Sequence, residues 1–353
     1  MSDPDPSETK PGRAPNPKIG RGMATALTAF LLLAAVSAGL FTAYAIRTLN
    51  QPADVSGPET TVVIKPGDTL LTISETLQVN RLITSSRLFR LLARYHGMSK
   101  RLQAGEYLLS PAMTPREILN LLSSGKVRLH RLTVPEGLTF RETATLVEQS
   151  GFGSRNNFIR LCTDRTFLKS LGIDQDSTEG YLFPETYFFP KTISEEEIIR
   201  TMVDRFNTVF RVAWRQQALE LGLTVNQVVT LASIIEKETG DASERPLISS
   251  VFHNRLKQGM RLESDPTVIY GIPDFNGNIT RKNLMEFTPY NTYRIQGLPP
   301  GPIANPGKSS LDAALYPPET DFLFFVSKQD TTHYFSRTRL EHEQAVRKYQ
   351  LKK

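Results

Sequence analysis

The sequence predicts an α+β protein: one membrane-spanning helix at the N-terminus, a small α+β module at 61–130 and a larger α+β domain at 131–353. Three observations support this prediction. An uncharged apolar run covers 23–46, a strand–turn–helix pattern begins at Thr61 and recurs near Leu132, and helical segments alternate with turn-rich ones beyond it. The 353 residues suffice for two folded domains, and 39% hydrophobic with 22% charged residues is ordinary for globular proteins.

The charge and cysteine content exclude several classes of function. The formal net charge of +6 is modest, and no nucleic-acid-binding signature is present, so no nucleic-acid partner is expected. An anionic membrane surface or an acidic polymer would suit this charge equally well. Cys162 is the only cysteine, which excludes an internal disulfide and a cysteine-based metal site and predicts a buried free thiol. Neither a metal nor a cofactor is expected.

The N-terminus predicts where the protein is located. Residues 1–22 are rich in Pro, Ser and charge, which is typical of a disordered tail. The apolar run after it would reach roughly 36 Å as a helix, enough to cross the hydrocarbon core of a membrane. Small residues at Ala34, Ala35 and Ser37 would suit a cleaved signal peptide, but such peptides usually have a shorter apolar core. The length therefore favours a permanent anchor at 23–46.

The distribution of basic residues predicts the orientation of this anchor. Four Lys or Arg residues precede the span and only Arg47 follows it closely, which places the tail in the cytoplasm. Everything after Arg47 would then face the periplasm or the cell exterior. Residues 47–60 are expected to form a short linker between the inner (cytoplasmic) membrane and the first folded module.

The module at 61–130 begins with an apolar strand from Thr61 and a Pro-Gly turn. Its further elements are expected to be helices at 70–77 and 86–96, a strand at 103–109, and a helix opened by a capping box at Thr114. The run Val63-Ile-Lys-Pro-Gly-Asp-Thr-Leu resembles a LysM motif, a small module that binds N-acetylglucosamine-containing glycans. The second half of that motif is not evident, and an ordinary turn between strand and helix is the alternative interpretation.

In the larger domain, the segment 178–189 combines aromatic rings with Glu179 and Glu185. Such clusters occur in carbohydrate clefts, although they are more often part of a protein core. A long helix is then expected at about 194–220, with Ser194 as its N-cap and three glutamates in its first turn. Negative charges there interact favourably with the helix dipole, so a structural role is expected for these three residues.

The segment 231–240 places Glu236 and Glu238 in a helix that is otherwise apolar or small. A carboxyl group in apolar surroundings is poorly hydrated when charged, so its pKa rises and it can act as a general acid near neutral pH. On a helical wheel Glu238 lies about 60° from Ile235, beside the apolar stripe, and roughly 160° from Glu236. The two carboxyl groups cannot face each other, and the wheel favours Glu238. A solvated helix end is the alternative.

A Pro/Gly-dense loop at 297–307 cannot form a helix or a central strand. Long loops of this kind often surround functional clefts. The side chains expected to contact sugar hydroxyl and acetamido groups lie in this loop and in the segments before it: Asn254, Arg255, Asp265, Tyr290, Asn291, Tyr293 and Asn305.

With these motifs in family order, the chain resembles the MltG/YceG family of endolytic murein transglycosylases, membrane-anchored periplasmic enzymes that cut peptidoglycan glycan strands. The motifs are Glu-Gly-Tyr-Leu-Phe-Pro-Glu-Thr-Tyr, Ala-Ser-Ile-Ile-Glu-Lys-Glu-Thr, Asn-Arg-Leu, Asp-Pro-Thr, Tyr-Asn-Thr-Tyr and Gly-Leu-Pro-Pro-Gly-Pro-Ile. The resemblance implies that Glu238, the second glutamate of Glu-Lys-Glu, is the essential residue. Glu263 departs from the pattern, because related sequences often carry Gln there, and this could alter the charge of a sugar subsite.

The reaction that the resemblance implies needs only one carboxyl group. Protonated Glu238 would donate to the glycosidic oxygen between N-acetylmuramic acid and N-acetylglucosamine, and its carboxylate would then accept the proton of the muramyl C6 hydroxyl. No water enters, so the second carboxylate of most glycosidases is dispensable. Such an enzyme could terminate strand elongation, with peptidoglycan synthases as candidate partners. A hydrolytic muramidase using Asp265 as a second group and a non-catalytic, membrane-tethered glycan-binding protein are the alternatives.

Overall fold

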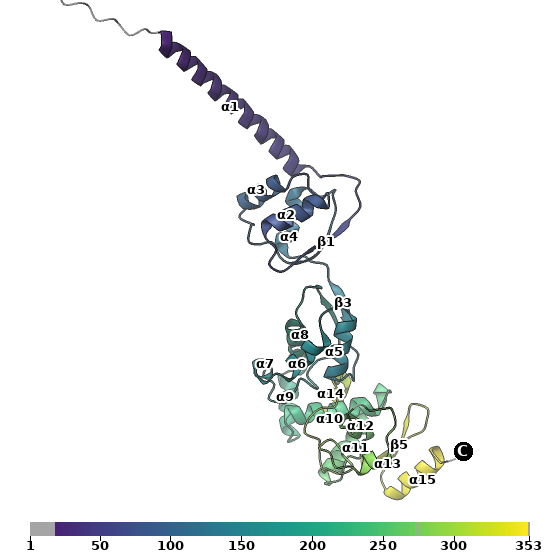
Figure 1. The fold of residues 1–353 in the computed structure, drawn as a ribbon. Coiled ribbons are helices and arrows are strands. Elements are labelled where there is room, and N and C mark those ends of the chain that lie inside the picture. Colours follow the sequence, from purple (N-terminus) through teal and green to yellow (C-terminus); the bar gives the residue numbers. More distant parts are fainter. Residues whose placement is uncertain (1–17, 274, 352–353) are drawn as a thin grey trace, which may run out of the picture. The chain divides into compact units, whose positions relative to one another are not determined.

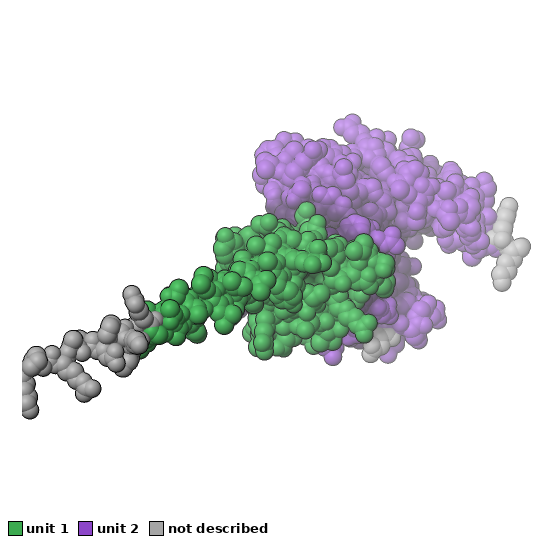
Figure 2. Space-filling model, turned by 90° about the horizontal axis from the view of Figure 1, so that it is seen from above, with its two compact units in different colours: residues 1–128 green, residues 129–353 purple. Residues whose placement is uncertain are grey.

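The computed structural model describes residues 18–273 and 275–351, which form two compact units divided between Arg128 and Leu129. Figure 1 shows the order of the helices and strands, and Figure 2 colours the two units separately. The sequence predicts this division after residue 130, two residues later. The disorder expected for 1–17 lies outside the described residues.

The first helix, α1 (Lys18–Asn50), contains the whole apolar run at 23–46 and begins inside the segment expected to be a tail. Within Gly22–Asn50, an 18-residue stretch has a mean hydropathy of 2.1, and its large apolar side chains are exposed rather than packed on the protein. An exposed apolar surface of this length suits a lipid environment. The helix is thus consistent with a single-pass membrane anchor.

The remainder of the first unit contains both helices and strands, as expected. Strand β1 pairs antiparallel with β2, with Val62 opposite Tyr107, and the inward-facing side chains of both strands are buried. The capping box at Thr114 is present at the start of α4. The elements after α1 are β1 (Thr60–Ile64), α2 (Leu70–Val79), α3 (Ser86–Tyr95), β2 (Gly105–Leu109) and α4 (Pro115–Ser124). Residues 51–59, between α1 and β1, form no helix or strand.

Over its described residues the second unit is mainly helical, with two small antiparallel sheets formed by β3 with β4 and by β5 with β6. The elements of its first half are β3 (His130–Thr133), α5 (Phe140–Gln149), α6 (Arg155–Thr163), α7 (Arg165–Ser170), β4 (Thr186–Phe189), α8 (Glu195–Val209) and α9 (Val212–Glu220). Those of its second half are α10 (Val225–Glu238), η1 (Ala242–Glu244), α11 (Arg245–Lys257), α12 (Asp265–Tyr270), α13 (Arg281–Met285), α14 (Lys308–Leu315), β5 (Phe324–Ser327), β6 (His333–Ser336) and α15 (Arg339–Tyr349).

The prediction of one long helix at 194–220 was wrong, because α8 ends at Val209 and α9 starts at Val212. The chain leaves helical geometry at Phe210 (φ −79°, ψ 63°). The buried ring of Phe210 stacks on Phe206 at 5.5 Å and meets the edge of Trp214 at 5.7 Å. Burying these aromatic rings together stabilises the break. No Gly or Pro marks it in the sequence.

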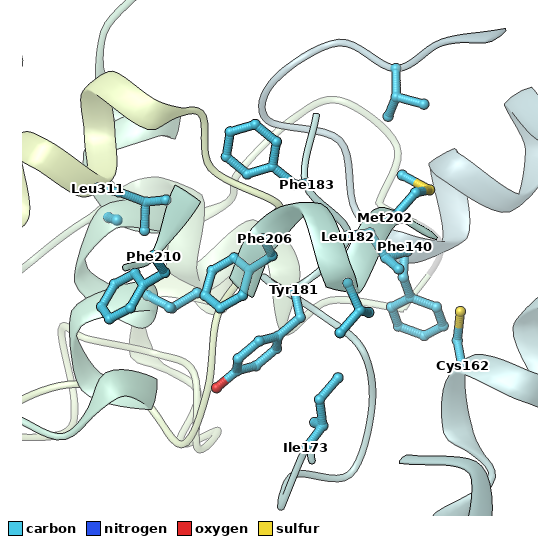
Figure 3. Close-up of a cluster of buried hydrophobic side chains, with 14 of the residues drawn as sticks. Phe140, Cys162, Ile173, Tyr181, Leu182, Phe183, Met202, Phe206, Phe210 and Leu311 are labelled. Atoms are coloured by element: carbon cyan, nitrogen blue, oxygen red, sulfur yellow. The ribbon is translucent and has the colours of Figure 1, made fainter. Parts of the chain in front are cut away.

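The core of the second unit joins residues that are distant along the chain. Figure 3 shows Phe140 of α5, Cys162 of α6, Met202 and Phe206 of α8, and Leu311 of α14 among its buried side chains. Cys162 is a buried free thiol, as predicted, and burial raises its pKa to about 12. A thiol with such a pKa stays protonated and unreactive at neutral pH.

Helix α10 passes through the middle of this unit and packs on α11 and α14. Its residues from Val228 to Ile235 are all buried, so the helix is covered on every side. The 297–307 loop packs on it rather than standing free, and the Ile303 N–H donates a 3.0 Å hydrogen bond to Ser233 Oγ. Gly180 (φ 85°) allows another close approach, since a Cβ there would lie 2.7 Å from Val229 Cγ1. This packing fixes the direction in which the end of α10 emerges.

Candidate active site

Glu238 is the last residue of α10, and Thr239 after it is extended. The buried helix therefore delivers this carboxyl group to the edge of the core. It lines a cavity of about 420 Å³, whose other walls come from α11, the start of α12 with the segment before it, Tyr293, the β5–β6 hairpin and α15. Segments separated by more than a hundred residues thus meet around one half-buried carboxyl group.

The surroundings of Glu238 adjust its pKa in opposite directions. Burial raises this pKa to about 7, and the negative charge of Asp265 acts in the same direction. A hydrogen bond donated by Ser264 Oγ to Glu238 Oε1 favours the charged form, as does the positive charge of Arg255. The resulting group is partly protonated near neutral pH, which is the property required of a general acid.

Glu236, the carboxyl group that the wheel did not favour, is bound by protein groups. Its side chain is only 5% exposed and pairs with Arg245 at 2.7 Å. Its other oxygen accepts hydrogen bonds from the Gly307 N–H at 2.9 Å and from Ser310 Oγ at 2.7 Å. These contacts fasten the last turn of α10 to α11 and to the start of α14. Glu236 does not line the cavity that contains Glu238.

Three of the residues expected to bind sugar line the same cavity as Glu238: Arg255, Asp265 and Tyr293. The Tyr293 hydroxyl donates a 2.8 Å hydrogen bond to Asp265 Oδ1. Arg255 pairs with Glu263 at 3.2 Å and donates a 2.9 Å hydrogen bond to the Leu262 carbonyl oxygen. These side chains form a polar wall beside the carboxyl group of Glu238.

Glu263, the residue that departs from the family pattern, is part of this wall. Its side chain is about half exposed, and its carboxylate pairs with the positive charge of the buried Arg255. Its backbone has a φ of 54°, a left-handed conformation that is uncommon for residues other than Gly and Asn. The Glu263 carboxylate therefore lies on the cavity wall, on a residue with a left-handed backbone conformation.

The other four expected residues lie elsewhere. Asn254 donates hydrogen bonds of 2.7 and 3.0 Å to two backbone carbonyls, Asn291 donates one of 2.6 Å to another, and Asn305 donates one of 2.8 Å. Tyr290 packs on the Tyr270 ring at 4.8 Å. None of the four lines the cavity of Glu238. Their side chains hold loops together. The residue type alone does not show whether such a side chain binds a loop or a sugar.

Sequence reasoning missed the C-terminal wall of the cavity, which includes His333 and His342. His333 Nδ1 lies 2.7 Å from Glu244 Oε2, and its backbone N–H donates to Glu244 Oε1 at 2.8 Å. Because a carboxylate only accepts, Nδ1 must carry a proton, and Nε2 is the nitrogen left without a protein partner in the described residues. The ring of His342 stacks on Phe324 at 5.2 Å, and burial lowers its pKa. No motif marks either histidine.

A second carboxyl group has an unusual pKa but no access to the cavity. Burial raises the pKa of Glu179 to about 8, although the Phe140 N–H (3.0 Å) and the Tyr270 hydroxyl (3.1 Å) donate to it. Its side chain is nearly completely buried and does not line the cavity of Glu238. A raised pKa by itself would therefore not distinguish these two glutamates. Access to a cavity does.

Residues 62–348 match the YceG-like family over most of the chain, from β1 to α15. The chain belongs to the YceG-like family. This YceG-like protein is 34% identical over 321 residues to the endolytic murein transglycosylase of Bacillus subtilis, covering 86% of this chain and 88% of that protein. It is 28% identical to the endolytic murein transglycosylase of Streptococcus pneumoniae R6, over 90% of this chain and 63% of that longer protein.

A crystal structure of a yceG-like protein from Listeria monocytogenes has a similar fold, with a TM-score of 0.58 and 34% identity. The superposition covers 81% of this chain and 98% of that chain. The resemblance drawn from the motifs is thus confirmed at the level of the family.

Proposed function

We propose that this YceG-like protein is an endolytic peptidoglycan lytic transglycosylase that uses Glu238 as its single general acid and base. The main support is the placement of Glu238, whose pKa is about 7, at the end of a buried helix and on the wall of a cavity. Relatives named endolytic murein transglycosylases match most of the chain, which supports the same substrate.

The proposed reaction proceeds in two proton transfers. Protonated Glu238 donates its proton to the glycosidic oxygen between N-acetylmuramic acid and N-acetylglucosamine as that bond breaks and an oxocarbenium-like state develops. The Glu238 carboxylate then accepts the proton of the muramyl C6 hydroxyl, whose oxygen bonds to C1 and closes a 1,6-anhydro ring. The glutamate ends as it began, protonated, and no water is consumed.

The neighbours of Glu238 would support these steps. The hydrogen bond from Ser264 orients the carboxyl group and stabilises it in the charged state between the two transfers. Arg255, Asp265 and Tyr293 are placed to contact the sugar, because they line the cavity. For Asn254, Tyr290, Asn291 and Asn305 we propose an indirect role, in which they hold the loops that shape the cavity wall.

We further propose that α1 holds the enzyme at the inner membrane, with the N-terminus in the cytoplasm and the chain after Arg47 outside it. The excess of basic residues before the span supports this orientation. Nascent glycan strands would be the substrate, and peptidoglycan synthases are candidate neighbours. A sugar-binding role for residues 61–130 stays a prediction.

The alternative with a specific observation in its favour is a hydrolytic muramidase. Asp265 lines the same cavity as Glu238, so it is available to activate a water. Such an enzyme would leave a reducing end, whereas the transglycosylase product is lighter by one water. Mass spectrometry of the fragments separates the two, and a non-catalytic binding protein would release no fragments.

The decisive test is digestion of purified glycan strands by the full chain in detergent micelles. We expect Glu238→Gln to lose cleavage by at least about 100-fold, since general acid catalysis contributes roughly 10²–10⁴-fold. Glu220→Gln is the matched control, because that glutamate is exposed on α9 and does not line the cavity. Retained cleavage by a folded Glu238→Gln variant would overturn the proposal.

A further inference from the structure

Positive charge is concentrated in one part of the first unit. Residues 76–105 contain six Lys and Arg residues and no Asp or Glu, so this segment alone carries +6, as much as the whole chain. Within the described residues, no ion pair involves any of the six. They are Arg81, Arg87, Arg90, Arg94, Lys100 and Arg101.

Helix α3 lies at the centre of this segment and is amphipathic. It buries Leu88, Phe89 and Ala93 in the module core. Its opposite side exposes Arg87 and Arg94, which are separated by two helical turns and therefore lie on one face. Two apolar or aromatic side chains accompany them: Leu91 is 51% exposed and Tyr95 is 85% exposed. We call Arg87, Leu91, Arg94 and Tyr95 the α3 surface.

A helix surface that mixes exposed arginines with a leucine and a tyrosine is typical of helices at a membrane–water interface. The apolar side chains enter the headgroup region, while each guanidinium group forms paired hydrogen bonds with a phosphate. In water, Leu91 would have no apolar environment to enter, and the largely exposed Tyr95 ring would keep its edge contact with the His96 ring at 5.3 Å.

The position of α3 within its unit places it close to the membrane. Helix α1 contacts α3 and α4. The partly buried residues near the C-terminal end of α1 are Ala45, Thr48 and Leu49, whereas residues 22–44 are exposed. Figure 1 shows α3 beside this end of α1. Because a hydrocarbon core of about 30 Å accommodates roughly 20 helical residues, Ala45 to Leu49 would lie at headgroup depth.

We propose that the α3 surface binds the phosphate groups of anionic phospholipids in the leaflet where α1 leaves the membrane. The contact adds a second attachment to the transmembrane helix and fixes the orientation of the first module relative to the bilayer. It depends on the anchor but not on cleavage, so it is independent of the proposed activity.

The test uses the full chain in nanodiscs of phosphatidylcholine, either pure or mixed with phosphatidylglycerol. Tyr95→Cys carries an environment-sensitive fluorophore, which the buried Cys162 does not compete for. We expect a blue shift of its emission and quenching by lipid-borne spin labels in the anionic nanodiscs only. Both effects should weaken at high salt, because salt screens exposed charges.

Charge reversal at Arg87→Glu with Arg94→Glu should abolish both effects, while Arg87→Lys with Arg94→Lys should retain most of them. A matched control is Arg211→Glu with Lys257→Glu, which reverses the same charge at exposed positions of the second unit. Equal signals in the two lipids, or signals that survive reversal at Arg87 and Arg94, would overturn the proposal. So would a signal that needs added glycan strands, since the surface would then bind cell wall.

Discussion

At the residue scale, the proposed chemistry depends on how a few neighbours set the protonation of Glu238. Burial and Asp265 favour its neutral form, whereas Ser264 and Arg255 favour its charged form. With a pKa of about 7, the acid form is abundant at neutral pH and the carboxylate is still a competent base for the second transfer. A much lower pKa would leave too little of the acid form for the first transfer, and a much higher pKa would leave the acid too weak to donate its proton readily.

This balance predicts the alkaline side of the pH profile. The general acid must start protonated, so kcat/KM for strand cleavage should be constant well below pH 7 and fall as the pH rises through about 7. Initial rates between acidic and alkaline pH provide the measurement. A rate that stays constant well above pH 8 would show that the acid is another group.

Two substitutions should move that alkaline limb in opposite directions. Ser264→Ala removes a hydrogen bond to the charged form, so the pKa of Glu238 rises and the limb moves to higher pH. Asp265→Asn removes a negative charge, so the same pKa falls and the limb moves to lower pH. The pH dependence of kcat/KM measures both shifts. Movement of both limbs in the same direction would contradict the assignment.

At the element scale, α10 carries two carboxyl groups with separate tasks. The helix is covered by α11, α14 and the 297–307 loop, so its last turn is rigidly placed. Glu236 fastens that turn through Arg245, Gly307 and Ser310, while Glu238 points to the cavity. One glutamate is structural because its oxygens have protein partners on all sides. The other is available for substrate.

Glu236→Gln should therefore reduce stability. It removes the buried carboxylate that pairs with Arg245 at 2.7 Å and leaves the half-exposed Glu136, at 3.4 Å, as the partner of that arginine. Breaking one side of a buried ion pair costs about 3 kcal/mol in the free energy of unfolding. Trp214, the only tryptophan, is buried in the second unit, so its fluorescence reports the unfolding of that unit in urea. Glu238→Gln should leave this transition nearly unchanged. Equal losses for the two variants would contradict the division of roles.

Glu179 joins α5 to α12 and should make stability depend on pH. Its pKa is about 8 in the folded protein against an ordinary value of 4.5, so the folded state holds an extra proton between these values. The free energy of unfolding should then fall as the pH rises from about 4.5 to 8. Glu179→Gln keeps the shape and both hydrogen-bond partners but removes this slope. Urea titrations followed by Trp214 fluorescence compare the two proteins, and an unchanged slope would exclude Glu179 as its source.

At the scale of the whole molecule, each unit has its own hydrophobic core. One core contains only residues of the first unit and the other only residues of the second. Among the described residues, those that line the cavity of Glu238 all belong to the second unit. Folding and chemistry are therefore expected to be separable from anchoring.

Residues 129–353 expressed alone should fold and cleave dissolved glycan strands. Circular dichroism and Trp214 fluorescence measure folding, and mass spectrometry of the fragments measures cleavage. The cleavage rate of this fragment on soluble strands should approach that of the full chain in micelles. A folded fragment with no activity would mean that the first unit contributes to the reaction.

Features that depend on residues close together along the chain could be predicted from the sequence, whereas features that depend on residues far apart could not. Capping boxes, the apolar run of α1 and the helical spacing of Glu236 and Glu238 depend on nearby residues, so the sequence predicted them. The break at Phe210 depends on rings packed from α8 and α9, and no local signal announced it. Asn254, Asn291 and Asn305 have residue types that suit sugars equally well, but their side chains bind backbone groups.

The sequence by itself predicted the long apolar helix, the mixed fold, the family resemblance and the preference for Glu238 over Glu236. These depend on composition, on periodicity and on motifs that are contiguous along the chain. Only the tertiary structure decided which side chains share a cavity with Glu238, including His333 beside Glu244 and the pairing of Arg255 with Glu263. The reason is physical: a pKa and a cavity wall depend on distances in space between segments that are far apart along the chain.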